Sequence, residues 1–263
     1  MKFESPRKRS AKFPAFLKRM WIAPAIFAAA LGCASLDEAF APPPAQLQAA
    51  ALQAWSGIKK QEKISTDPRY TRRMQRVAPR VIRAAGGNPA EWEVRVFQSD
   101  QLNAFALPGG KIGFYTGILD LMDNDDQIAA VMGHEVAHVE RQHAAKRAGR
   151  AMQTQLGLGV AGAAIGARGG NQDAWLQVLG LGAQIGSTLP FSRGHELEAD
   201  TIGLRYMMRA GYDPNEAVRF WEKMEASKSG APPEFLSTHP GGQTRIRQLR
   251  EEIAILQGRG AGS

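Results

Sequence analysis

Two histidines four residues apart, with a glutamate directly after the first, constrain this chain more than any other feature. They are His134, Glu135 and His138, in the segment VMGHEVAHV at 131–139. Residues four apart share one face of an α-helix, so both imidazole rings can reach the same ion. Glu135 lies about 100° further round the helix, where its carboxylate can contact a water on that ion without being a ligand. The pattern therefore predicts a helix that carries a zinc site, with Glu135 as the base.

The residues around this motif predict where its helix begins and ends. Asn124 is a candidate N-cap, and Gln127 three residues later fits a capping box. Apolar residues then recur at helical spacing and give one face that packs into a core. They are Ile128, Val131, Met132 and Val136. We expect the helix to run from about 125 to 148 and to end near Gly149.

A catalytic zinc ion usually has three protein ligands and one open position, so a third ligand is needed. In one known pattern a glycine three residues and a histidine six residues after the second histidine follow the motif. Here those positions hold Arg141 and Ala144. His143 lies five residues after His138, about 140° off its face, and we expect it at the surface.

A second predicted helix offers the missing ligand. It begins after the N-cap candidate Ser192 and runs to Ala210, before Gly211. Glu196 and Asp200 lie four residues apart on one face of this helix. Glu196 can therefore bind the metal while Asp200 accepts the spare N–H of a ligating histidine.

Two neighbours in this second helix, His195 and Glu198, lie on other faces, and we expect Glu198 to face solvent. There is also a simpler interpretation of the first motif, in which His134 and His138 are ordinary packed or exposed histidines. That interpretation leaves the glutamate between them unexplained.

Four segments in the same order resemble the HtpX and CAAX-prenyl-protease type of zinc metallopeptidase, a gluzincin family. They are NAFALPGG at 103–110, HEVAH at 134–138, SRGHELEAD at 192–200, and STHP at 237–240 followed by Arg245 and Ile246. The resemblance covers roughly residues 67–255 and includes the BepA- and LoiP-like periplasmic branch. It implies a zincin-like fold of the α+β class, mainly α-helical, with a small sheet beside the motif helix. It also implies one Zn²⁺ per chain, held by His134, His138 and Glu196.

Three short strands are predicted before the motif helix. They are 92–97, 102–107 and 111–115, and Pro108-Gly109-Gly110 predicts a hairpin turn between the last two. One interpretation is a small sheet that covers the helical core. The other adds a function, because an edge strand at Asn103, Ala104 and Phe105 can pair with the backbone of an extended substrate. Such pairing would make the side-chain specificity broad.

The resemblance implies hydrolysis of peptide bonds. Zinc lowers the pKa of a bound water and polarises the scissile carbonyl, and Glu135 takes the proton and passes it to the leaving amine. His239, before Pro240, has three candidate roles: a donor to the oxyanion, a fourth zinc ligand that blocks the position of the water, or an ordinary loop residue. Arg245 either supports the same region or simply lies on the last helix.

The start of the chain predicts export and a lipid anchor. Residues 1–32 join a basic region to an apolar stretch, 21–31, that is too short for a comfortable membrane span. Gly32 then precedes Cys33, the only cysteine, which resembles a bacterial lipobox with Cys33 as the lipidated residue. Ala34 resembles a signal for the outer membrane, so we expect a lipid-anchored periplasmic protein of a Gram-negative bacterium. The alternative is an uncleaved anchor or an ordinary signal peptide.

Composition divides the rest of the chain. We expect a tether with a possible helix at 33–66, the metallopeptidase domain at 67–255 and a flexible tail at 256–263. Within the domain, residues 156–190 are apolar and rich in Gly and Ala, but neither half reaches the roughly 20 residues of a bilayer span. This segment is therefore expected as a closely packed helical hairpin or as a lid over the cleft.

The net charge does not indicate a nucleic-acid partner. The chain carries 33 basic and 25 acidic residues, a net charge of +8, but residues 1–32 hold seven of the bases and one of the acids, which leaves +2. The leading hypothesis is an anchored zinc endopeptidase whose substrates are unfolded, misfolded or misassembled envelope proteins. The alternative is a latent or non-proteolytic zinc-binding chaperone or interaction module of the envelope. No sequence feature indicates an oligomeric state.

Overall fold

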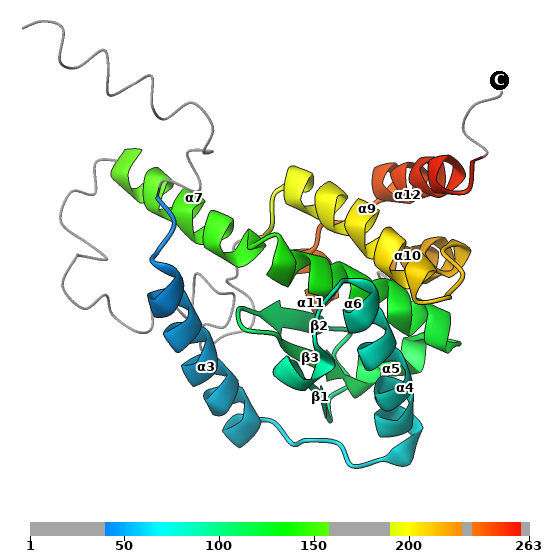
Figure 1. Cartoon of the computed structure of the whole chain (residues 1–263), viewed down its shortest axis with the longest axis horizontal. Helices are drawn as coiled ribbons and strands as arrows, with labels where there is room; N and C mark the ends of the chain where they lie inside the picture. The colour runs from blue at the N-terminus through cyan, green and yellow to red at the C-terminus, as the bar shows by residue number, and fades with distance from the viewer. Residues whose placement is uncertain (1–39, 158–189, 228–232, 259–263) are drawn as a thin grey trace, which may run out of the picture. The chain divides into compact units, whose positions relative to one another are not determined.

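The computed structural model describes residues 40–157, 190–227 and 233–258 (Figure 1). The helices are α3 (Pro44–Gln61), α4 (Pro68–Ala84), the 3₁₀ helix η1 (Pro89–Glu91), α5 (Thr116–Leu121), α6 (Asp125–Glu140), α7 (His143–Gly157), α9 (Arg193–Arg209), α10 (Asn215–Ala226), α11 (Glu234–Thr238) and α12 (Gln243–Leu256). The expected signal peptide, Cys33 and nearly all of the apolar segment 156–190 lie outside the described residues. Within the described ranges, no helix combines the length and the apolar character that a bilayer crossing requires.

The predicted small sheet is present, beside a mainly helical core. Its strands are β1 (Glu93–Phe97), β2 (Ala104–Leu107) and β3 (Lys111–Tyr115), in the order β1-β3-β2. β1 runs parallel to β3, and β2 runs antiparallel to it. Gly109 and Gly110 adopt φ of 80° and 70° in the turn between β2 and β3, a conformation that glycine adopts at no steric cost. Because β2 stands last in the strand order, it is an edge strand, as the sequence predicted.

The sheet lies between two apolar clusters because successive side chains of a strand point to opposite faces. Val96 and Phe114 join the main core, whereas the next residues along the strands, Phe97 and Tyr115, pack against α3. Trp55 of α3 is 2% exposed, and its Nε1–H donates to Glu93 Oε2 at 2.8 Å. The helix expected within 33–66 is thus observed, and it covers the outer face of the sheet (Figure 1).

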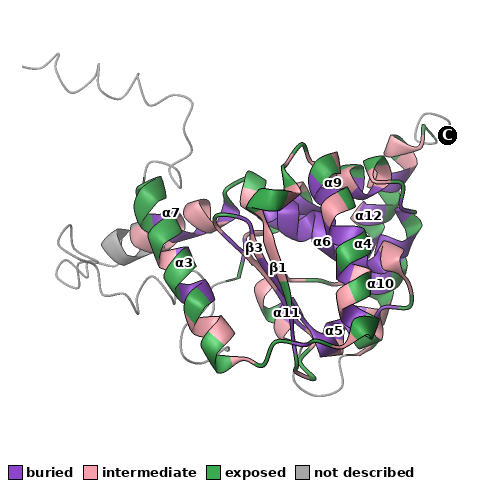
Figure 2. Cartoon of the chain, turned by 60° about the horizontal axis from the view of Figure 1, so that its bottom comes forward, coloured by how far each residue is buried: buried purple, intermediate pink, exposed green. Residues whose placement is uncertain are grey.

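α6 is the central helix of the main core. α4, α9, α10 and β2 all pack against it, and all but one of its residues from 127 to 138 are buried (Figure 2). Asn124 caps the helix as predicted, since its Oδ1 accepts from the Gln127 amide at 3.0 Å. The sequence predicted one apolar face, but the structure buries α6 on nearly every side.

α6 and α9 cross with their backbones in contact. A Cβ atom added to Gly203 would lie 2.7 Å from the His134 amide nitrogen, and one added to Gly133 would lie 2.7 Å from the Gly203 carbonyl oxygen. Both distances are shorter than van der Waals contact. The crossing therefore needs glycine on both helices, and it brings the backbone of α9 directly beside His134.

The predicted continuous helix over 125–148 is wrong. α6 ends at Glu140, and α7 begins at His143. Gln142 between them adopts φ 53°, in the left-handed region that costs a non-glycine residue roughly 1–2 kcal/mol. No glycine or proline stands at 140–143, so the sequence carries no ordinary marker of this break.

Gly203→Ala is expected to lower the free energy of unfolding by about 1–3 kcal/mol, because the new methyl group meets rigid backbone atoms of α6. Urea denaturation measures the effect. The matched control is Gly57→Ala in α3, where nothing lies within 4 Å of the added Cβ and better helix propensity should stabilise by about 0.5–1 kcal/mol. Equal stability of Gly203→Ala and the parent would show that the helix crossing is not tight.

Candidate metal centre

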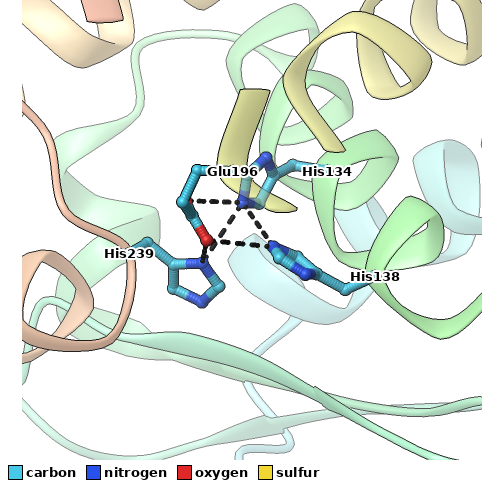
Figure 3. A group of neighbouring side chains, drawn as sticks. All are labelled: His134, His138, Glu196 and His239. Atoms are coloured by element: carbon cyan, nitrogen blue, oxygen red, sulfur yellow. Dashed lines mark hydrogen bonds and ion pairs between the residues drawn. The ribbon is translucent and has the colours of Figure 1, made fainter. Parts of the chain in front are cut away.

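Three histidines and one glutamate meet in the interior of the main core. His134 and His138 come from α6, Glu196 from α9, and His239 directly follows α11. Each side chain offers one ligand atom, and these four atoms lie within 4.8 Å of one another. All four residues are exposed by 4% or less. Figure 3 shows the four side chains pointing toward one another.

The spacing of these atoms fits a tetrahedral zinc ion. Ligands about 2.0–2.1 Å from zinc stand about 3.3 Å from one another at tetrahedral angles. His134 Nε2 lies 2.9 Å from His138 Nε2 and 3.2 Å from His239 Nδ1. Glu196 Oε1 lies 3.4 Å from His138 Nε2 and 3.1 Å from His239 Nδ1. Imidazole nitrogen and carboxylate oxygen are also the donor types that zinc prefers.

Glu135 lies beside this cluster without belonging to it. Its side chain is 1% exposed, and within the described part of the chain its Oε1 has no hydrogen-bond partner. His239 Nε2 lies 3.6 Å from this oxygen. Burial raises the pKa of the Glu135 carboxyl, so its carboxylate is a stronger proton acceptor than an exposed one. An unsatisfied buried carboxylate oxygen is costly, and a catalytic role is one of the reasons for which a protein keeps such a group.

Asp200 and Arg245 form hydrogen bonds that support the residues of the cluster. Asp200 Oδ1 lies 2.9 Å from His134 Nδ1, where it can accept the spare N–H of the ring. Arg245 of α12 donates twice to Asp200, at 2.7 and 2.6 Å, and once to Glu196 Oε2 at 2.8 Å. Its guanidinium lies 3.6 Å from the centre of the Trp221 ring. Arg245 lies on the last helix and supports the site, so the first of its two alternatives is confirmed.

The charges of these groups shift one another's pKa values. Burial alone would raise the pKa of Glu196, but His239 and Arg245 hold it well below its usual value. Burial alone would lower the pKa of His134, but hydrogen bonds to Asp200 and Glu196 outweigh it and raise this pKa to about 9. Burial and the neighbouring His134 lower the pKa of His138. His134 is therefore positively charged at neutral pH in the metal-free protein, whereas His138 is neutral. A metal ion must displace the proton on His134 Nε2.

His143 is not at the surface, so that prediction is wrong. Its ring is fully buried, and its Nδ1 lies 2.9 Å from Nδ1 of His138. The left-handed turn at Gln142 causes this, because it redirects the chain after α6 and carries His143 back over His138. Glu198, which was expected to face solvent, keeps 30% of its side chain exposed but lies 3.1 Å from His143 Nε2. The ring of His195 stacks on His143, with 4.5 Å between centroids.

A cavity of about 480 Å³ reaches the cluster at His138. Its walls come from 41–44 with the first turn of α3, from 106–109 of β2 and its turn, from 144–146 of α7, and from Phe191. The Phe191 ring stacks on His138 at 4.2 Å, and its amide donates to the Thr238 carbonyl at 3.1 Å. The cavity therefore connects the metal cluster with the edge strand of the sheet.

None of the three predicted substrate-binding residues lines this cavity. Asn103 and Ala104 are 7% and 0% exposed, and Phe105 packs against α3. It is the second half of β2, Ala106 and Leu107, that lines the cavity. Substrate binding by Asn103, Ala104 and Phe105 stays a prediction.

Known proteins share this sequence pattern. A family model described as peptidase family M48 matches residues 68–253, which include every residue of the cluster. Mitochondrial metalloendopeptidase OMA1 of Schizosaccharomyces pombe is 37% identical over 186 residues, which cover 70% of this chain and 53% of that protein. The beta-barrel assembly-enhancing protease of Escherichia coli strain K12 is 31% identical over 193 residues, covering 70% of this chain and 39% of that protein.

The chain thus spans about half the length of the first relative and about two fifths of the second. The match to the family model extends from the start of α4 almost to the end of α12, so it includes the sheet, both helices that cross at Gly133 and Gly203, and Arg245. The chain belongs to peptidase family M48, and its buried cluster of three histidines and one glutamate is suited to hold one zinc ion.

Proposed function

We propose that this chain is a zinc-dependent endopeptidase that hydrolyses peptide bonds in unfolded or misassembled proteins. The observation that carries the proposal is Glu135, a buried carboxylate next to a set of ligand atoms with zinc spacing. Its Oε1 receives no hydrogen bond from any residue that the structure describes. A purely structural zinc site needs no base beside it. Membership of peptidase family M48 supports the same reaction.

In this mechanism His134, His138 and Glu196 hold the metal. When bound, zinc lowers the pKa of a water molecule and polarises the scissile carbonyl. Glu135 accepts the proton of the attacking water and then donates it to the leaving amine. Asp200 keeps the proton of His134 on Nδ1, so that Nε2 presents its lone pair to the metal. Arg245 offsets the buried negative charge of Glu196 and Asp200.

The substrate class follows from the cavity beside His138. An extended polypeptide can pair with the free edge of β2 through its backbone, and unfolded segments expose far more backbone for such pairing than folded proteins do. Leu47, Leu107 and Phe191 give the cavity apolar walls that suit an apolar substrate side chain. The proposed substrates are therefore unfolded chains that expose apolar residues, rather than folded proteins.

The position of His239 supports a resting state that is closed. Its Nδ1 lies 3.2 Å from His134 Nε2 and 3.1 Å from Glu196 Oε1, where a fourth zinc ligand would be. A catalytic zinc needs that position for water and substrate. His239 must then move away before cleavage. The same observation favours the second candidate function, a latent zinc-binding module of the envelope.

The proposed location is the periplasmic side of a bacterial outer membrane, with a lipid anchor on Cys33. The basic and apolar stretches of residues 1–32 and the Gly32-Cys33 pair support it. The name of one relative, a beta-barrel assembly-enhancing protease, also supports it, because β-barrels are the spanning proteins of that membrane. Other relatives are named as mitochondrial enzymes, so the family as a whole does not fix the location.

Glu135→Gln is expected to reduce cleavage of unfolded casein by at least about 100-fold, because the amide cannot accept the proton. Zinc content per chain should stay at the parent value, since Glu135 is not a ligand. Chelator-treated parent protein is the control for metal dependence. Normal turnover by Glu135→Gln would exclude the proposed mechanism.

His239→Ala is expected to raise the cleavage rate of the same substrate, because three ligands remain and the fourth position opens. Zinc content must be measured alongside, so that loss of metal is not mistaken for loss of chemistry. A lower rate with zinc retained would instead assign His239 to stabilisation of the oxyanion. It would also remove the support for a closed resting state.

Cys33→Ser is expected to move the full-length protein from the membrane fraction to the soluble fraction of bacterial cells, because a serine cannot carry the thioether-linked lipid. Fractionation followed by immunodetection measures this, with the parent chain as reference. Continued partition of Cys33→Ser with the membrane would contradict the lipid anchor.

A further inference from the structure

We propose that His143 and Glu198 form a relay that positions His138 for metal binding. The inference rests on the proposed zinc site, and it assigns a task to two residues outside the ligand set. His143 is a positioning residue in this scheme, because it contacts a ligand and not the metal. The relay consists of Glu198, His143 and His138, in that order toward the metal.

The hydrogen-bond geometry fixes the direction of the relay. His143 Nε2 lies 3.1 Å from Glu198 Oε2. A carboxylate only accepts, so His143 carries its proton on Nε2. A neutral imidazole has one N–H, which leaves His143 Nδ1 as an acceptor. His138 Nδ1, at 2.9 Å, therefore donates to it.

This assignment sets the tautomer of His138. With its proton on Nδ1, the ring of His138 presents the lone pair of Nε2 to the metal cluster. That nitrogen already lies 2.9 Å from His134 Nε2 and 3.4 Å from Glu196 Oε1. A donated N–H raises the basicity of the opposite nitrogen and fixes the orientation of the ring.

Each of the two ligand histidines is then oriented by a carboxylate of α9. His134 donates directly to Asp200, whereas His138 reaches Glu198 through one intervening imidazole. Both carboxylates lie on α9, on either side of Ala199, and Glu196 of the same helix is a ligand itself. α9 thus supplies the ligand Glu196 and also the carboxylates that orient the ligands His134 and His138.

The relay is held in place from three directions. The left-handed turn at Gln142 sets the start of α7 over His138. His195 stacks on the His143 ring with only 12° between the ring planes. Arg141 forms an ion pair with the other carboxylate oxygen of Glu198. Because His143 is fully buried, its ring has little freedom to leave this position.

The test is the zinc dissociation constant of three variants, measured by competition with a chromophoric chelator. His143→Phe keeps a flat ring in the stack but removes the acceptor, and we expect zinc affinity to fall by about 10- to 100-fold. His143→Asn restores an acceptor oxygen at the place of Nδ1 and should recover most of the loss. Tyr206→Phe is the matched control. It removes another hydrogen bond between α6 and α9, from Tyr206 to Glu140, away from the cluster, and should leave zinc affinity unchanged.

The melting temperature of each zinc-free variant separates metal positioning from folding. We expect zinc-free His143→Phe and zinc-free His143→Asn to have similar melting temperatures, although only His143→Asn binds zinc well. Equal zinc affinity of His143→Phe and the parent would overturn the relay. An equal loss of zinc affinity in His143→Phe and His143→Asn would also overturn it, because the loss would then come from altered packing and not from the missing acceptor. If the parent itself binds no zinc, the proposed function fails instead, so the two failures are distinguishable.

Discussion

The contact between Gly133 of α6 and Gly203 of α9 is the constraint on which the rest of the site depends. Two helices normally pack with 8–10 Å between their axes, and small residues at the crossing allow the closest approach. Here a single added methyl group on either helix would meet backbone atoms at 2.7 Å. The close approach lets the short side chain of Asp200 reach His134 from the neighbouring helix, and it puts Glu196 within metal-binding distance of both histidines.

Arg245 compensates the negative charge of two carboxylates that are buried at this crossing. Glu135, Glu196 and Asp200 are all buried around this crossing, and buried carboxylates without compensation are strongly unfavourable. Arg245 pairs with two of them and stacks on Trp221. Glu135 is the one that Arg245 does not pair with, and its pKa is raised where those of Glu196 and Asp200 are lowered. The carboxylates that pair with Arg245 therefore stay ionised, whereas Glu135 accepts a proton more readily.

The part of the site that depends on helical spacing could be predicted from the sequence. His134, His138, Glu196 and Asp200 lie at four-residue intervals with recognisable N-caps, so their shared faces follow from local geometry. The small sheet followed from alternation and from a glycine turn. The meeting of the two helices could not be derived this way and came from the resemblance. The burial of His143 was missed, because it depends on the left-handed backbone conformation of Gln142. No glycine or proline near Gln142 indicates that the helix breaks there.

Arg245 also makes the metal centre depend on the last described helix. Its contacts to His134 join positions 111 residues apart, and its helix is the last of the described chain. A contact of such sequence separation closes a long loop, which costs chain entropy. A chain in which α12 has not docked therefore lacks the cation that makes the buried carboxylates tolerable. The metal centre is therefore complete only when the last described helix is in place.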